Sequence, residues 1–229
     1  MTPVVLVPGL LCSSEIFAAQ IQRLWAFGPV TVASTLGGDG IESAAASILR
    51  YAPPRFALAG ISMGGYLSLE IIRQAPSRVL KLALLDTSAR PDTVEQTAAR
   101  LRTLERARTS FTAVALLELE RLLHPRRRSD PDIVEVNLRM ARAVGLDGYE
   151  RQLGIAISRP DSRPFLGAID VPTLVLVGDC DPLTPLDHSE EIASAVRGAV
   201  LSVVTDCGHL SPIEQPGQVS EALARWIQD

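Results

Sequence analysis

The 229-residue sequence lacks the features that mark several classes of protein. It has three cysteines, an odd number without the spacing of metal ligands, which fits free thiols in a reducing compartment. No apolar run is long enough to cross a bilayer, and the net charge of −4 gives no basic footprint for nucleic acid. No basic segment with a cleavage site opens the chain. We therefore expect a cytoplasmic protein that binds neither nucleic acid nor a membrane.

Apolar residues, in contrast, are abundant. They make up 47% of the chain, against 21% charged residues, which supports a sizeable core and argues against disorder. Aromatic residues account for only 4% of the sequence, so most of that core must be aliphatic. The length fits one domain with room for an insertion.

Short apolar runs alternate with helical patterns at both ends of the chain, and the region between them is helical throughout. The strand-like runs cover 4–7, 30–33, 56–59, 79–85, 173–177 and 200–204. Helical patterns without strands fill 93–108, 111–123, 132–144 and 148–157. Strands separated by helices pair in parallel through right-handed crossovers. We predict an α/β fold, a six-stranded and mainly parallel sheet flanked by helices, with a core of residues 1–88 and 166–229 and a helical cap inserted at 89–165.

Residues 56–67 combine an apolar strand, a sharp Gly-Ile-Ser-Met-Gly turn and a helix. Such a turn holds its serine, here Ser62, in a strained conformation with the hydroxyl above the edge of the sheet. The strand and the helix pass close to each other there, and the small residues Gly60, Gly64 and Gly65 allow this approach. Because the helix points its positive end at Ser62, negative charge is favoured at that position. Ser62 is therefore the candidate nucleophile.

Polar residues also follow two later strands. Asp179 and Asp181 come after the strand at 173–177, and His209 follows the strand at 200–204. The carboxyl ends of parallel strands meet at one edge of a sheet, so these side chains are expected near Ser62. A histidine can take the serine proton during attack on a carbonyl and return it to the leaving group, while an aspartate orients the imidazole. Backbone N–H groups of Met63 and of Leu10, in the loop after the first strand, are the candidate oxyanion-hole donors.

Four motifs together carry a resemblance to a known family. They are Val-Pro-Gly-Leu-Leu at 7–11, Gly-Ile-Ser-Met-Gly-Gly at 60–65, Val-Gly-Asp-Cys-Asp-Pro-Leu-Thr-Pro at 177–185 and Cys-Gly-His-Leu at 207–210. With them the chain resembles the α/β-hydrolase-fold superfamily over nearly its whole length. The family often has His-Gly after the first strand, where this sequence has Pro8-Gly9. Two strands that commonly come first in the family are also missing, which agrees with six strands.

The resemblance implies a catalytic triad with Ser62 as nucleophile, Asp181 as acid and His209 as base, and Leu10 and Met63 as oxyanion donors. It selects Asp181 over Asp179 through the family pattern Gly-x-x-Asp. It implies no metal and no organic cofactor. The expected function is a serine hydrolase that cleaves a small carboxylic ester through an acyl-enzyme. The alternatives are an enol-lactone or carbon–carbon bond hydrolase, or a related lyase, with the same triad, and a non-catalytic binding member of the fold.

The cap is expected to shape the substrate pocket. With so few aromatic residues, the sequence predicts an aliphatic lining. The candidate lining residues are Leu11, Ile16, Leu116, Leu119, Leu122 and Leu183. Arg126, Arg127 and Arg128 are interpreted as a solvated face, with the alternative that a cap arginine receives a substrate carboxylate.

The remaining histidines and the cysteines have less specific interpretations. His124 and His188 are expected to be solvated or structural. Cys12, Cys180 and Cys207 each follow a strand at the same predicted edge, where they are interpreted as small loop residues, with a thiol role as the alternative.

Overall fold

Six strands form one parallel sheet in the computed structural model, which describes residues 1–228. Their order across the sheet is β2-β1-β3-β4-β5-β6, and all five neighbouring pairs are parallel. The prediction of a six-stranded α/β fold is therefore confirmed. The strands are β1 (Val4–Val7), β2 (Val30–Val32), β3 (Phe56–Ile61), β4 (Val79–Leu85), β5 (Thr173–Gly178) and β6 (Val200–Val204).

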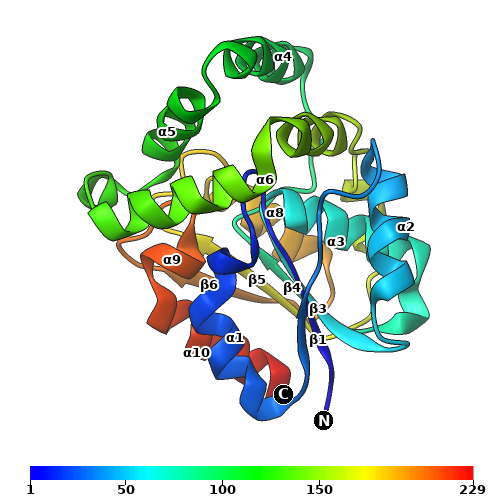
Figure 1. The fold of residues 1–229 in the computed structure, drawn as a ribbon. Coiled ribbons are helices and arrows are strands. Elements are labelled where there is room, and N and C mark those ends of the chain that lie inside the picture. The colour runs from blue at the N-terminus through cyan, green and yellow to red at the C-terminus, as the bar shows by residue number, and fades with distance from the viewer. Residues whose placement is uncertain (229) are drawn as a thin grey trace.

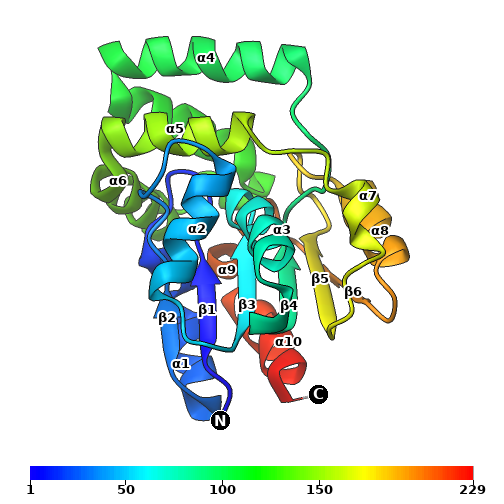
Figure 2. The same cartoon turned by 90° about the vertical axis from the view of Figure 1, so that its right-hand side faces the viewer.

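Helices cover both faces of this sheet (Figures 1 and 2). The helix α1 (Ala18–Leu24) packs beside α10 (Pro216–Gln228), and α2 (Ile41–Tyr51) packs beside α3 (Met63–Gln74). The helix α8 (Leu186–Ala195) lies against β5 and β6. Between these main helices the chain forms shorter ones, namely η1 (Ser14–Phe17), η2 (Trp25–Phe27), η3 (Pro76–Arg78), η4 (Pro125–Arg127), α7 (Arg163–Leu166) and α9 (Ser211–Glu214).

Each face of the sheet has its own apolar core. Val4 and Leu6 of β1 point to one side, where they join the core that includes Leu24. Val5 and Val7 point to the other side and join the core that includes Ile48. Because successive side chains of a strand alternate between faces, a run of four apolar residues fits a strand covered on both sides.

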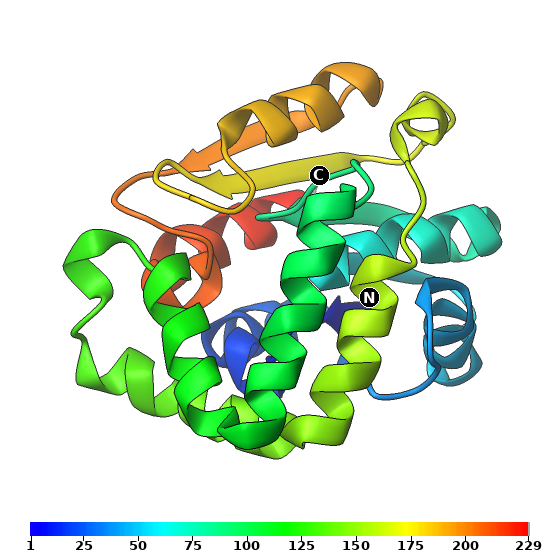
Figure 3. The same cartoon turned by 90° about the horizontal axis from the view of Figure 1, so that it is seen from above.

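Three further helices lie between β4 and β5 in the sequence. They are α4 (Val94–Thr109), α5 (Phe111–Leu122) and α6 (Pro131–Ile157). Figures 2 and 3 show them above the carboxyl ends of the strands. We call them the inserted helices. They match the helical patterns of the sequence, while the division into a core and a cap at 89–165 stays a prediction.

The two helices predicted at 132–144 and 148–157 form one span in the structure, α6, with a break inside it. The break lies at Gly145, whose φ of 68° and ψ of 175° are not helical. Glycine adopts this conformation at little steric cost, which explains why the chain can turn there. The sequence did not predict α7 or α9, both only four residues long. Within residues 1–228, no helix combines the length and the apolarity that a membrane span requires.

Candidate active site

Ser62 lies on the tight turn between β3 and α3. Its φ of 53° and ψ of −118° are strained for a residue with a side chain. The turn is fixed by the Ser62 N–H, which donates to the Leu85 carbonyl at 2.9 Å, and by the Thr87 hydroxyl, which donates to the Ser62 carbonyl at 2.8 Å. A Cβ atom at Gly64 would lie 2.0 Å from the Val7 carbonyl oxygen, so only glycine fits this position. The predicted strand, turn and helix are thus all present.

The structure brings Ser62, His209 and Asp181 together in one hydrogen-bonded chain. The distance from Ser62 Oγ to His209 Nε2 is 2.8 Å, and that from His209 Nδ1 to Asp181 Oδ2 is 2.7 Å. The histidine is 147 residues from the serine in sequence, and the two side chains meet because their loops follow strands of one parallel sheet. This is the arrangement in which an imidazole can accept a proton from a serine hydroxyl.

Asp181 is held as a carboxylate by a shell of donors. The N–H groups of Leu183 and Thr184 donate to its Oδ1 at 2.8 and 3.0 Å, and the Thr184 hydroxyl donates to Oδ2 at 2.7 Å. Burial raises the pKa of Asp181, but the positive charge of His209 and these hydrogen bonds lower it more, so the net shift is downward. For His209, burial lowers the pKa and the charge of Asp181 raises it more, so the net shift is upward.

Asp179, the other acid of that loop, has a different position. Its carboxylate accepts hydrogen bonds from the N–H groups of Asp206 and Cys207, at 3.1 and 3.0 Å. It therefore joins the loop after β5 to the loop that carries His209. No hydrogen bond links Asp179 to the imidazole in the described part of the chain.

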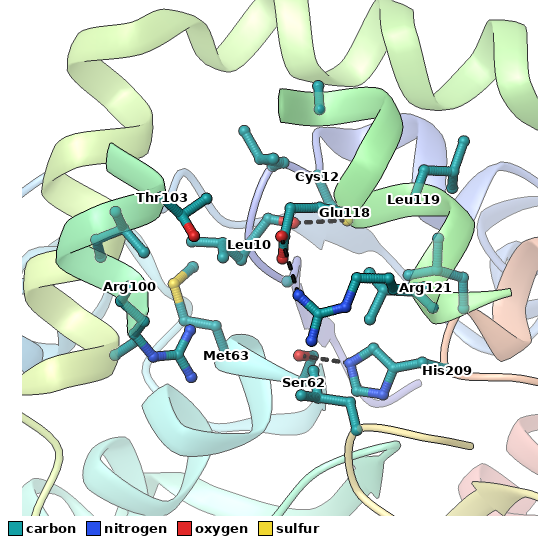
Figure 4. A pocket seen from close by; sticks show the side chains of 18 of the residues that line it. Leu10, Cys12, Ser62, Met63, Arg100, Thr103, Glu118, Leu119, Arg121 and His209 are labelled. Carbon is teal, nitrogen blue, oxygen red and sulfur yellow. Dashed lines mark hydrogen bonds and ion pairs between the residues drawn. The ribbon is translucent and has the colours of Figure 1, made fainter. Parts of the chain in front are cut away.

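A cavity of about 370 Å³ opens above Ser62 (Figure 4). The residues Leu10, Met63 and His209 line it together with Ser62. The N–H groups of Leu10 and Met63 donate to no other residue within 1–228 and are free to bind an oxygen atom. In the same loop, the residue after Leu10 is strained: Leu11 has a φ of 59°.

The lining of this cavity differs in part from the sequence prediction. Leu11, Leu119, Leu122 and Leu183 line it. Ile16 does not, because it is fully buried in the core below. Leu116 does not either, because it lies on the outer side of α5 and is 38% exposed. The predicted aliphatic wall is also interrupted by polar and aromatic side chains, namely Tyr66, Gln96, Arg100, Thr103, Glu118, Arg121, Arg128, Asn137 and Tyr149.

Two buried acids next to the site were missed by the sequence interpretation. Asp86 accepts a hydrogen bond from the Gly178 N–H at 3.0 Å and another from the Ser211 hydroxyl. It therefore joins the end of β5 to the segment just after His209. Burial, aided by the charge of Asp181, raises the pKa of Asp86 to about 8. The signal that could have revealed Asp86 is its place directly after β4, at the same edge of the sheet where Asp179 and Asp181 follow β5.

The second missed acid is Glu214, which joins α9 to the segment just after α5. Its carboxylate accepts from the His124 N–H at 2.7 Å and from the Leu210 N–H at 3.0 Å. The His209 N–H, in turn, donates to the Leu122 carbonyl at 2.8 Å. His124 is buried, so of its two interpretations the structural one holds and the solvated one does not.

The arginine run and the cysteines are dispersed in space. Arg126 pairs with Asp206 and Arg127 with Asp130, while Arg128 lines the cavity. The other histidine, His188, is half-buried, and burial lowers its pKa.

Among the thiols, Cys12 lines the cavity and is buried, and burial raises its pKa to about 12. Such a thiol stays protonated and weakly nucleophilic at neutral pH. Cys207 is buried as well, with its pKa raised by burial, whereas Cys180 is exposed. All three are free thiols.

Comparison with known proteins places this chain in a family. Residues 44–216 match the model of the alpha/beta hydrolase fold, and the chain belongs to that family. A solved esterase from Thermogutta terrifontis, with malate bound, is 31% identical, with a TM-score of 0.89, over 100% of this chain and 90% of that one. The enol-lactonase from Burkholderia xenovorans LB400 is 22% identical, with a TM-score of 0.87, over 100% of this chain and 92% of its own, which shows a common fold.

A curated relative is the poly(3-hydroxyalkanoate) depolymerase of Ectopseudomonas oleovorans. It is 29% identical over 145 residues, which are 63% of this chain and 51% of the depolymerase. The match thus spans about half of the length of that relative. Together with the esterase, it supports a hydrolase.

Proposed function

We propose that this protein is a serine esterase that cleaves a small carboxylic ester through an acyl-enzyme on Ser62. The observation that carries the proposal is the hydrogen-bonded chain from Ser62 Oγ through His209 to Asp181, with distances of 2.8 and 2.7 Å, at the base of a cavity. The family and the similarity to a solved esterase support the same class of reaction.

In the first half of the proposed reaction, Ser62 Oγ attacks the ester carbonyl carbon while His209 Nε2 takes its proton. Asp181 stabilises the imidazolium that forms and keeps its Nδ1 proton in place. The carbonyl oxygen becomes an oxyanion, which the free N–H groups of Leu10 and Met63 bind. Loss of one such donor typically removes about 3–4 kcal/mol of transition-state stabilisation.

Collapse of this intermediate expels the alcohol, which leaves with the proton from His209. The acyl group then stays on Ser62 as an ester. In the second half, His209 takes a proton from a water molecule, the hydroxide adds to the acyl carbon, and the acid product leaves as Ser62 recovers its proton. The proposed reaction needs no reactant besides the ester and water.

The inserted helices are proposed to act as a cap over the core formed by residues 1–88 and 166–229. They supply the upper wall of the cavity, including Leu119 and Leu122. The C-terminal end of α5 is bonded to the loop of His209, which supports a cap that is joined to the catalytic base. The cytoplasmic location stays a prediction.

The test is a panel of substrates assayed with the wild type, Ser62→Ala and Ser77→Ala. The panel holds p-nitrophenyl esters of increasing acyl length, an enol-lactone and a 1,3-diketone. We expect turnover of short esters, a loss of at least about 10³-fold in Ser62→Ala, and unchanged rates in Ser77→Ala, an exposed serine.

Two results would overturn the proposal as stated. Cleavage of only the lactone or only the diketone would favour the alternative bond classes on the same residues. Unaltered ester cleavage by Ser62→Ala would remove the acyl-enzyme.

A further inference from the structure

We propose that the cavity accepts esters that carry a second, ionised carboxyl group, and that Arg100 of α4 binds this carboxylate. The proposal deepens the function proposed above and rests on it, because Ser62 would cleave the ester bond of the same molecule. It assigns to Arg100 a role in substrate selection.

The charges that line the cavity are unbalanced. Arg100, Arg121 and Arg128 line it, whereas Glu118 is the one Asp or Glu side chain in the wall formed by residues 1–228. Glu118 is paired with Arg121 at 3.3 Å. Two positive side chains therefore remain without a negative partner in the wall, which favours a negatively charged ligand.

Arg100 is the arginine with the most defined position. Its Nε lies 2.7 Å from Asp92 Oδ2, and its Nη2 lies 3.3 Å from Asp92 Oδ1. Asp92 also pairs with Arg159 at 2.6 Å. The Asp92 side chain is only 2% exposed, those of Arg159 and Arg100 7% and 20%. One carboxylate thus serves two guanidinium groups, and the cluster keeps one positive charge.

This cluster leaves one donor nitrogen of Arg100 free. Arg100 Nη1 makes no hydrogen bond or ion pair with residues 1–228, although Arg100 lines the cavity. Figure 4 shows the Arg100 side chain on the same side of the cavity as Met63. A guanidinium held on one edge by a carboxylate can bind a second carboxylate on its other edge, because its N–H groups point outward in a fixed plane.

Two phenol groups extend this donor set. Tyr66 and Tyr149 are buried and line the cavity, and neither hydroxyl has a hydrogen-bond partner among residues 1–228. The Arg159 guanidinium packs over the Tyr66 ring at 4.2 Å from its centroid. Burial lowers the pKa of Arg100 and Asp92 raises it more, so the net shift is upward.

Both phenols are suited to donate. Burial, aided by the charge of Glu118, raises the pKa of Tyr149 to about 12, so its hydroxyl keeps its proton at neutral pH. A carboxylate bound to Arg100 can also accept from these hydroxyls, which have no hydrogen-bond partner among residues 1–228. A neutral acyl chain at this place would leave them unpaired.

The test compares two esters that differ in charge. Mono-p-nitrophenyl glutarate carries a free carboxylate, and p-nitrophenyl pentanoate carries a methyl group in its place. We expect the wild type to prefer the charged ester in kcat/KM by about 10-fold or more. In Arg100→Gln this preference should fall by about 10- to 100-fold, mainly through KM. Arg100→Lys should keep part of it, since it keeps the charge but loses the planar fork.

Arg102→Gln is the matched control, because Arg102 lies on the same helix but is exposed and outside the cavity wall. The Arg102→Gln variant should prefer the charged ester over the uncharged one as strongly as the wild type does. Arg100→Gln leaves Asp92 paired with Arg159, and thermal unfolding will verify that this variant is folded. Equal kcat/KM for both esters in the wild type, or an unaltered preference in Arg100→Gln, would overturn the proposal.

A binding measurement separates this proposal from the function it rests on. Calorimetric titration of Ser62→Ala with glutarate needs no catalysis. We expect glutarate to bind, dimethyl glutarate to bind more weakly, and the double variant Ser62→Ala/Arg100→Gln to lose glutarate affinity. Glutarate binding without any ester turnover would contradict only the esterase function, whereas ester turnover without glutarate binding to Arg100 would contradict only this inference.

Discussion

The backbone N–H of Leu11 donates to the side-chain oxygen of Gln152 at 2.8 Å, across 141 residues of sequence. Gln152 is fully buried on α6, and its amide group donates in turn to the Thr35 hydroxyl at 2.8 Å. Leu11 has the unfavourable φ of 59°. The hydrogen bond therefore helps to hold the turn that leaves the N–H of the preceding residue, Leu10, free at the cavity.

Replacing Gln152 by Ala should misplace this loop. We expect kcat to fall by about 10-fold or more with a smaller change in KM, because the proposed donor acts on the transition state. Stability should also fall, by about 1–3 kcal/mol, since buried N–H and hydroxyl groups lose their partner. Steady-state kinetics measure kcat and KM, and urea unfolding measures the stability. Gln22→Ala, at an exposed position of α1, is the control, and equal kcat in all three proteins would contradict a role of Gln152 in positioning the loop.

The pH dependence of activity should report on His209, which must be neutral to accept the serine proton. Burial lowers its pKa, and Asp181 raises it more, with further increases from Asp86 and Glu214. Since the net shift is upward from 6.5, the acid limb of kcat/KM should have its midpoint above this value. Asp181→Asn should move the midpoint down and lower kcat by about 10³- to 10⁴-fold. A rate that is flat between about pH 5 and 8 would be incompatible with His209 as the base.

Asp86 should make the folded state less stable as the pH rises. Its pKa is about 8 in the folded protein and about 3.9 in an unfolded chain. Between these values the folded state binds more protons than the unfolded state, so the free energy of unfolding falls with increasing pH. Asp86→Asn can keep the bonds to Gly178 and Ser211 without this cost.

We therefore expect a smaller loss of stability from about pH 5 to 8 in Asp86→Asn than in the wild type. Thermal unfolding at both pH values measures it. Asp170→Asn, at a residue that is 81% exposed, should behave like the wild type. A loss of stability as large in Asp86→Asn as in the wild type would refute the raised pKa of Asp86.

The sheet and the three polar residues of the site could be predicted from local patterns, from the topology of a parallel sheet and from the family resemblance. The strand, turn and helix around Ser62 need only the neighbouring residues. The rule that the carboxyl ends of parallel strands share an edge placed His209 there together with both Asp179 and Asp181, and the family resemblance selected Asp181. Asp86 follows the same rule and was still missed, since no expected pattern pointed to an acid after β4.

The cavity wall could not be predicted in the same way, because it depends on how the inserted helices pack on the sheet. Leu116 and Leu119 lie one helical turn apart on α5, yet only Leu119 faces the cavity. The low aromatic content was a poor guide, since Tyr66 and Tyr149 both line the wall. The arginine run at 126–128 drew attention by its sequence, whereas Arg100, an ordinary residue of a helix, is the one that Asp92 fixes beside the cavity.

Labelling with a fluorophosphonate tests the central claim most directly, because the probe reacts only with an activated serine. Intact-mass and peptide mass spectrometry of the labelled wild type should show one adduct, on the peptide that contains Ser62. Labelling should be lost in Ser62→Ala, greatly slowed by replacing His209 with Ala, and normal in Ser77→Ala. An unlabelled wild type, or a Ser62→Ala variant labelled as fully as the wild type, would contradict Ser62 as the nucleophile.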